Sequence, residues 1–131
     1  MTGMREAIRK TRTGQGLQAN LPWARYLFEA GFPGFDGHFP GRPVLPGVCM
    51  LKAAVVTLED WHATAIRVSE VRKARFLSPL GPGQELEVRC IAHKQTDDSL
   101  VAQLTMRGTE DRRTSGCTIH YSLERGERTP L

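Results

Sequence analysis

Cysteine is scarce in this sequence of 131 residues, and its distribution argues against two kinds of scaffold. The three cysteines, Cys49, Cys90 and Cys117, are far apart and form no CxxC motif. An odd number at such spacing is typical neither of a disulfide framework nor of a zinc knuckle. Reduced thiols in a cytoplasmic protein are the simplest interpretation, so we expect a cytoplasmic location.

Long apolar runs and long runs of one charge are also missing. No stretch reaches the ~18–20 apolar residues that a membrane-spanning helix needs, and the opening MTGMREAIRK lacks the apolar core of a secretory signal. The net charge is +4, from 18 basic and 14 acidic residues. This excess fits a solvated surface as well as an acidic partner or substrate. No nucleic acid is expected as a partner, because the chain has no recognised binding motif and few paired aromatics.

The most apolar segment, residues 48–61, predicts a buried helix. Only Lys52, Glu59 and Asp60 are charged in VCMLKAAVVTLEDW, and a helix that is apolar almost all round is usually buried. Lys52 and Glu59 share a face but lie about 10 Å apart along the axis, too far for a tight ion pair. Because a small domain covers such a helix poorly, we expect a homo-oligomer.

After His62 the apolar residues alternate with polar ones, which is typical of half-buried antiparallel strands. Turns are expected at 81–83 and 96–99, so that the strands form a meander. The predicted strands cover approximately residues 66–76, 85–93, 100–107 and 117–123.

The first thirty residues carry weaker signals. Residues 4–13 favour a first strand, 14–16 a turn, and 17–21 a returning strand that Pro22 ends. Residues 23–30 could form a short helix, and the favoured role for its aromatic side chains is simply to fill the core.

One long helix with about five or six antiparallel strands predicts an α+β protein, in which the sheet wraps around the helix. We expect a single domain over residues 1–131, with frayed ends at 1–3 and 125–131.

The segment before the helix, FDGHFPGRPVLPGV at residues 35–48, is rich in glycine and proline around His38. Glycine lets the backbone approach a ligand closely, and proline stiffens a loop. His38 is therefore expected on a rigid loop beside a helix N-terminus, where it could act as a general base next to a carbonyl-binding or anion-binding site. The alternative is a loop histidine that only caps a neighbouring carbonyl.

With its following apolar helix, GHFPGRPVLPGV resembles the β-hydroxyacyl-acyl-carrier-protein dehydratases, which have the hot-dog fold. Residues 72–88, RKARFLSPLGPGQELEV, resemble the next strand, turn and strand of the same family. The resemblance implies a hot-dog dimer with active sites at its interface. It also implies a 3-hydroxyacyl thioester on the phosphopantetheine arm of an acyl carrier protein, which loses water to give the trans-2-enoyl thioester. Neither a metal nor a bound cofactor is implied.

The same resemblance assigns roles to individual residues. His38 becomes the base, and its unperturbed pKa near 6.5 suits that role. Backbone N–H groups of Gly47 and Val48 are expected to bind the thioester oxygen; Pro46 has no N–H to donate. Substrate binding is assigned to Gly47, Val48, Phe39 and Pro46. Docking of the carrier protein is assigned to Arg42, Arg72, Lys73 and Arg75.

Lys52 departs from the family, because it stands where the family has an acidic residue that helps the hydroxyl leave. Lys52 could itself be catalytic and protonate the hydroxyl, if burial lowers its pKa. Glu59 or Asp36 could supply the acid instead, although Asp36 is better explained as a turn residue that orients the loop.

Dehydration could also have been lost, which would leave an acyl-thioester-binding subunit or a thioesterase. A structural alternative is that Lys52 snorkels at an interface. Dehydratases that serve aryl polyene pathways resemble this form of the loop and can lack the carboxylate, so we expect that subgroup.

The remaining candidate groups carry weaker signals. His62, His93 and His120 have no ligand spacing, so no metal site is predicted. Cys49 lies at the helix start, where a thiol could be activated, but a buried apolar role is favoured.

Overall fold

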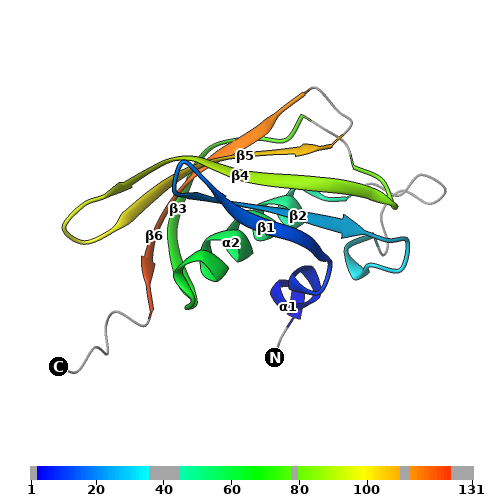
Figure 1. The fold of residues 1–131 in the computed structure, drawn as a ribbon, viewed down its shortest axis with the longest axis horizontal. Helices are drawn as coiled ribbons and strands as arrows, with labels where there is room; N and C mark the ends of the chain where they lie inside the picture. Colours follow the sequence, from blue (N-terminus) through cyan, green and yellow to red (C-terminus); the bar gives the residue numbers. More distant parts are fainter. Residues whose placement is uncertain (1–2, 36–44, 78–79, 110–112, 125–131) are drawn as a thin grey trace.

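A computed structural model describes residues 3–35, 45–77, 80–109 and 113–124, and it confirms the α+β prediction. A six-stranded antiparallel sheet, in the order β1-β2-β4-β5-β6-β3, curves over helix α2 (Figure 1). In chain order the elements are α1 (Gly3–Arg9), β1 (Arg12–Gln18), β2 (Leu21–Phe28), the 3₁₀ turn η1 (Pro33–Phe35), α2 (Gly47–His62), β3 (Ile66–Arg75), β4 (Gln84–Gln95), β5 (Leu100–Gly108) and β6 (Ser115–Leu123).

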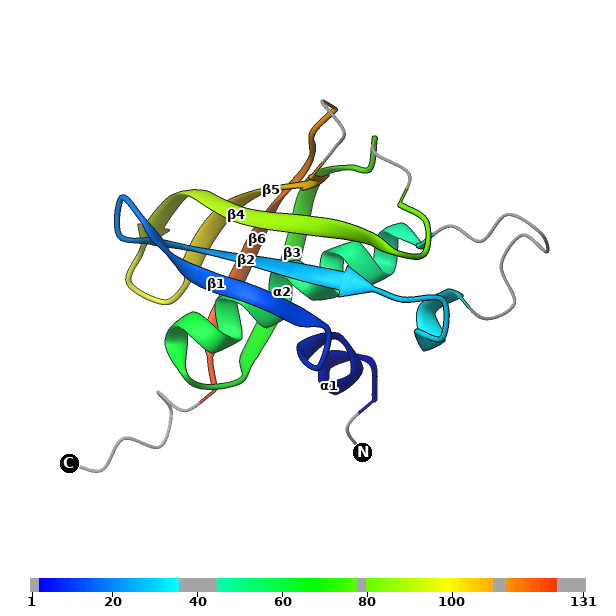
Figure 2. The ribbon, with the colours of Figure 1, turned by 45° about the vertical axis from the view of Figure 1, so that its right-hand side comes forward.

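The strand order leaves β1 and β3 at the two edges of the sheet. Strands β4, β5 and β6 form a meander of antiparallel neighbours, as expected. The expectation that β3 precedes β4 in the same meander was wrong, because β3 pairs with β6. The chain passes from β2 through α2 to β3 at the far edge beside β6, and then returns to place β4 next to β2. This path carries α2 across the inner face of the sheet, as Figure 2 shows from a second side.

Helix α2 is buried along most of its length, as the apolar run predicted. Residues from Ala53 to Glu59 are all buried. The helix packs on the inner face of the sheet, where Tyr26, Val88 and Ile119 are also buried, and α1 covers part of it. The helix ends at Ala63, whose φ of 57° is left-handed and whose N–H bonds back to the Glu59 carbonyl. Among the described residues, no helix is long and apolar enough to cross a membrane.

The prediction of a strand over residues 4–13 was wrong in its first half. Residues 3–9 form α1, and only then does β1 begin. Ile8 of α1 is fully buried, while Arg5 and Arg9, one helical turn apart, both reach carboxylates on α2. Contacts with α2 therefore stabilise a helix that is too short to be stable alone.

The turn expected at residues 14–16 was also wrong, because Gly14 and Gly16 lie inside β1. The hairpin turns instead at Ala19 and Asn20, which both have left-handed backbone, with φ of 53° and 66°. Glycine at position 16 makes room for an indole ring: a Cβ there would stand 3.0 Å from Nε1 of Trp23.

Residues 21–28 form strand β2 and not the predicted short helix. Ala24, Tyr26 and Phe28 are buried in alternation, but apolar residues between them hide the period of two. Pro22 does not end the strand. It precedes the first pair with β4, Trp23 with Arg89, so its missing N–H removes no hydrogen bond from that ladder.

Candidate active site

Helix α2 begins at Gly47, so the backbone N–H groups of Gly47 and Val48 lie in its first turn. Pro46 is the N-cap and makes no side-chain capping bond. Its carbonyl accepts the first helical hydrogen bonds, from the N–H groups of Cys49 at 2.9 Å and Met50 at 3.3 Å. The N–H groups of Gly47 and Val48 come before these and have no acceptor within the helix. Together with the helix dipole, they favour an oxygen with negative charge.

Exposed apolar side chains surround this helix start. Val48 is 56% exposed, Phe76 41% and Leu77 39%. A Cβ at Gly47 would stand 2.8 Å from Cδ2 of Phe76, so glycine lets the ring pack directly on the first turn of the helix. We call Gly47, Val48, Phe76 and Leu77 the α2 N-terminal surface. It combines apolar area with polar donors, as a site for an acyl thioester requires.

Several predicted site residues lie outside the described part of the chain. These are His38, Phe39, Arg42 and the turn residue Asp36. Their roles remain predictions. The described chain resumes at Leu45, whose N–H donates to the Leu80 carbonyl at 2.7 Å and so joins the segment before α2 to the segment after β3.

Lys52 lies one turn into α2 and is half-buried. Its ammonium is close enough to the Cys49 thiol to lower the pKa of that thiol, but burial is the larger effect, and the net pKa is raised. A protonated thiol is a poor nucleophile. Cys49 therefore fits the buried apolar role that was favoured for it.

Glu59 cannot supply the missing acid to the start of its own helix. It lies twelve residues after Gly47, which is about 18 Å along the axis. Glu59 is 5% exposed and accepts hydrogen bonds from Arg5 at 2.9 Å, Arg9 at 3.1 Å and the N–H of Ile66 at 3.0 Å. Both carboxylate oxygens are thus engaged, so Glu59 is not available as the acid at the start of its own helix.

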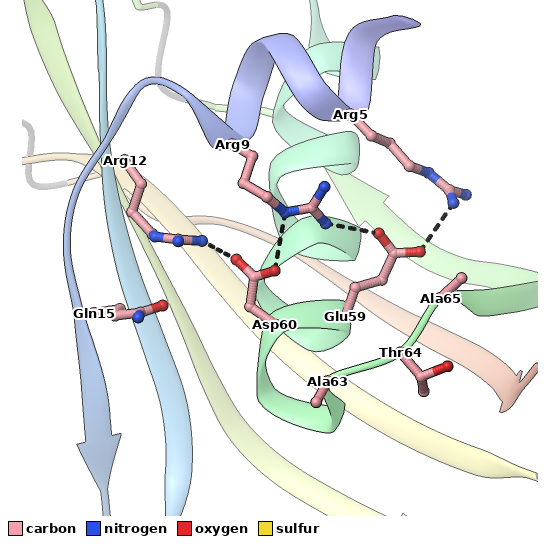
Figure 3. A pocket seen from close by; sticks show the side chains of 9 residues that line it. All are labelled: Arg5, Arg9, Arg12, Gln15, Glu59, Asp60, Ala63, Thr64 and Ala65. Carbon is pink, nitrogen blue, oxygen red and sulfur yellow. Dashed lines mark hydrogen bonds and ion pairs between the residues drawn. The ribbon is translucent and has the colours of Figure 1, made fainter. Parts of the chain in front are cut away.

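Glu59 belongs to a charge clamp at the C-terminal end of α2, which we define as Arg5, Arg9, Arg12, Glu59 and Asp60. Arg9 also donates to Asp60 at 2.9 Å, and Arg12 pairs with the other oxygen of Asp60. Figure 3 shows the three arginines paired with the two carboxylates. All five residues line a cavity of about 600 Å³. The clamp was not predicted from the sequence; the one signal for it is the four-residue spacing of Arg5 and Arg9.

Three of the residues assigned to carrier docking lie together on the edge strand β3. Arg72, Lys73 and Arg75 are exposed, and the strand is irregular here, with a φ of 55° at Lys73. Arg72 donates to Glu70 at 2.6 Å. The next residue after Arg75 is Phe76, which packs on Gly47, so this basic end of β3 leads directly to the α2 N-terminal surface.

A second polar cluster, also missed, lies at the same C-terminal end of α2. Nε2 of His62 and Nε2 of His93 lie 2.7 Å and 2.9 Å from the hydroxyl of Tyr121. Burial lowers the pKa of both imidazoles. We call His62, Tyr121 and His93 the His–Tyr–His cluster. The described residues contain no group of three or more His, Cys, Asp or Glu that could hold a metal ion.

Solved structures with the same architecture define the class of the protein as a hot-dog fold. The dehydratase heterocomplex ApeI:P from Xenorhabdus doucetiae aligns with a TM-score of 0.67 and 21% identity, over 84% of this chain and 95% of that one. The PaaI protein from the phenylacetic acid degradation operon of E. coli aligns with a TM-score of 0.64 and 14% identity, over 92% and 89% of the two chains. At these identities the likeness shows the fold alone.

The family follows from the sequence comparisons. The profile of the ApeI-like family, described as ApeI dehydratase, matches residues 18–116, and the chain belongs to this family. The 3-hydroxyacyl-[acyl-carrier-protein] dehydratase FabZ of Latilactobacillus sakei is 37% identical over 70 residues, which cover 48% of this chain and 50% of the relative. FabZ of Haemophilus influenzae strain 86-028NP is 35% identical over 86 residues, 58% of each chain. The matches thus span about half the length of these curated relatives, and the expected family and subgroup are confirmed.

Proposed function

We propose that this chain is a 3-hydroxyacyl-acyl-carrier-protein dehydratase, which removes water from a 3-hydroxyacyl thioester to give the trans-2-enoyl thioester. The pathway is fatty acid or aryl-polyene-type biosynthesis. Membership of the ApeI-like family supports the reaction class. The observation that carries the proposal is the α2 N-terminal surface, where Gly47 and Val48 present backbone N–H groups beside exposed apolar side chains.

In the proposed reaction, His38 takes a proton from the carbon next to the thioester carbonyl. The N–H groups of Gly47 and Val48 stabilise the charge that develops on the thioester oxygen. The electron pair left by the proton forms the new carbon–carbon double bond, and the C3–oxygen bond breaks. The hydroxyl leaves as water after it receives a proton from an acid, and the half-buried Lys52 is the candidate within this chain.

The expected partners follow from the substrate. An acyl carrier protein is acidic in character and would meet the basic end of β3, where Arg72, Lys73 and Arg75 are exposed. Pairing of two hot-dog chains as a homodimer would also cover the exposed Val48 and Phe76. The reaction uses no resident metal or cofactor, and we place it in the cytoplasm, where carrier-bound substrates and reduced thiols fit.

Lys52 supports a second candidate, an acyl-thioester-binding subunit that acts beside a non-identical hot-dog chain. That partner would supply the carboxylate that this chain lacks. The ApeI:P structure from Xenorhabdus doucetiae is itself described as a dehydratase heterocomplex, and such an arrangement would explain a lysine here without new chemistry.

The first experiment is to mix the purified protein with a short 3-hydroxyacyl carrier protein and to follow the acyl group by mass spectrometry. Loss of one water by the protein alone supports the dehydratase. Binding without turnover supports the subunit and contradicts the first proposal. Release of the free acid would show a thioesterase, against which stands the engagement of Glu59 with Arg5 and Arg9.

Lys52→Glu separates the two candidates further. If Lys52 is the acid of an active dehydratase, Lys52→Met lowers turnover, whereas Lys52→Glu retains it, because a glutamic acid can also donate a proton. If the native chain is an inactive subunit, Lys52→Glu alone should create turnover. Neither result is expected from a lysine that only snorkels, for which both variants would match the native chain.

A further inference from the structure

The first turn of α2 carries the donors of the proposed site, and other segments contact it on two sides. Gly47 and Cys49 are two residues apart, which is about 200° around a helix axis, so they face opposite sides of this turn. The ring of Phe76 lies on the side of Gly47. Gly34, in the short turn η1, lies on the side of Cys49. The two contacts therefore hold the same helical turn from opposite directions.

Gly34 approaches α2 so closely that no side chain fits between them. A Cβ at Gly34 would stand 2.9 Å from Sγ of Cys49 and 2.5 Å from Cε2 of Phe32. Ordinary contacts between carbon atoms are about 3.5–4.0 Å, so an added methyl group would displace its neighbours. The φ of Gly34 is not in the left-handed region. Space, and not backbone conformation, therefore requires a glycine here.

The neighbours of Gly34 in η1 have little room to move aside. Phe28, Phe32 and Phe35 are all buried, and the centroid of the Phe32 ring lies 4.7 Å from that of Phe28 and 6.2 Å from that of Phe35. The N–H of Phe35 donates to the Phe32 carbonyl at 3.1 Å, which closes the turn. On the opposite side of the helix, the Phe76 ring is 41% exposed and has room to move. The contact with η1 is thus the rigid one of the two.

Small displacements of this helical turn matter for the proposed reaction. The N–H groups of Gly47 and Val48 can stabilise a developing charge only if they point to the position of the thioester oxygen. A misplacement of about 1 Å can lower the rate of a catalysed reaction about 10²-fold. Since Cys49 directly follows Val48 in the same turn, a shift at Cys49 also moves these donors.

We infer that Gly34 is a positioning residue of the proposed dehydratase: by packing directly on Cys49, it orients the two N–H groups at the start of α2. The inference rests on the proposed function and assigns a role in it to η1. It also explains why position 49 has a small buried side chain, because a longer one would push η1 away.

The test is Gly34→Ala, assayed for water loss from a 3-hydroxyacyl carrier protein. We expect kcat to fall at least about tenfold and KM to stay within about twofold, because the donors are misdirected while the substrate still binds. The matched control is Gly31→Ala, where a Cβ would meet nothing within 4 Å and kcat should be native. In Gly34→Ala/Cys49→Ala, removal of Sγ makes room on the helix side, and part of the lost kcat should return.

A second measurement follows the donors without turnover. A saturated acyl thioester on the carrier protein, labelled with ¹³C at its carbonyl carbon, has no hydroxyl to lose. Hydrogen bonds to its oxygen shift the ¹³C NMR signal, and Gly34→Ala should reduce this shift while Gly31→Ala retains it. If the native protein removes no water, the proposed dehydration fails, and this signal still shows whether Gly34 orients the donors.

Three results would overturn the inference. They are a folded Gly34→Ala variant with native kcat and carbonyl signal, losses of the same size in Gly31→Ala, and an unshifted carbonyl signal in the native protein. Thermal unfolding shows whether each variant is folded at the assay temperature. If Gly34→Ala does not fold, Phe35→Leu loosens the same turn by removing one ring contact. Native kcat and carbonyl signal in Phe35→Leu would then contradict positioning by η1.

Discussion

The two ends of helix α2 differ in what surrounds them. At the N-terminal end, Pro46 makes no side-chain cap, and Val48 and Phe76 are exposed beside it. At the C-terminal end, Glu59 is buried under two arginines, and the hydroxyl of Tyr121 meets two imidazoles. One end keeps backbone groups available to a ligand, while the other satisfies its polar groups with side chains.

This difference shows how one helix can both hold the fold together and present a site. A helix start whose N-cap residue makes no side-chain bond lacks the stability that such caps usually provide, and the braced C-terminal end offsets that loss. The predictions that follow change one end at a time. Variants at the N-terminal end, which we call the open end, should alter turnover more than stability. Variants at the C-terminal end, which we call the braced end, should alter stability more than turnover.

The largest effect is expected for His38→Ala. Loss of a general base should lower the rate of water loss about 10³-fold, with little change in the free energy of unfolding. The rate is measured with a 3-hydroxyacyl carrier protein and the stability by urea denaturation. His120→Ala, which removes a histidine from the outer side of β6, should retain the native rate. A His38→Ala variant with a near-native rate would remove His38 as the base.

Glu59→Gln should weaken the charge clamp at the C-terminal end of α2. The amide keeps an acceptor for the Ile66 N–H but loses the charge that Arg5 and Arg9 contact, so the free energy of unfolding should fall by about 2 kcal/mol. Urea denaturation measures this change. The control is Glu70→Gln, which removes an exposed pair with Arg72 and should not change stability measurably. Equal losses in the two variants would contradict the distinction between the clamp and a surface pair.

Gly47→Ala tests whether Phe76 shapes the site at the N-terminal end of α2. The new Cβ would stand 2.8 Å from Cδ2 of Phe76, so the exposed ring must move. We expect a loss of about 1 kcal/mol in stability and a several-fold fall in turnover, because the ring borders the donors of the helix start. Gly31→Ala, where a Cβ would meet nothing within 4 Å, is the matched control. A native turnover in Gly47→Ala would show that Phe76 does not shape the site.

The smallest effect concerns pH at the braced end. Since the pKa values of His62 and His93 are lowered in the folded state, the unfolded chain binds more protons as the pH falls below about 6.5. Stability should therefore be full above pH 6.5 and decline on acidification through the lowered pKa values. Thermal unfolding between pH 7.5 and 5 measures the decline, which should shrink in the double variant His62→Gln/His93→Gln. An unchanged pH profile in that variant would assign the decline to other groups.

How well the sequence predicts the secondary structure of each segment depends on the length of its hydrophobic pattern. The run from Val48 to Trp61 is long and uniformly apolar, so α2 was predicted within one residue at each end. Strands β4 to β6 alternate cleanly and were also predicted. The region before residue 30 was not, since Trp23 and Leu27 fill the outward positions of β2 and disguise a strand, and a seven-residue helix has no pattern of its own.

The residues of the candidate sites could likewise be predicted only in part from the sequence. Gly47 and Val48 could be predicted because they adjoin a local motif, and α2 does begin there. The charge clamp and the His–Tyr–His cluster could not, because their members are separated by up to about sixty residues: Arg5 and Glu59 are 54 apart, and His62 and Tyr121 are 59 apart.

By itself, the sequence determined the buried helix, the meander of β4 to β6 and the family, because each depends on residues that are neighbours along the chain. Only the tertiary structure decided that Glu59 and Asp60 are paired with arginines, and which histidines meet. The physical reason is that charges and hydrogen bonds act over a few ångströms in space, and a path through a six-stranded sheet places distant residues at that range.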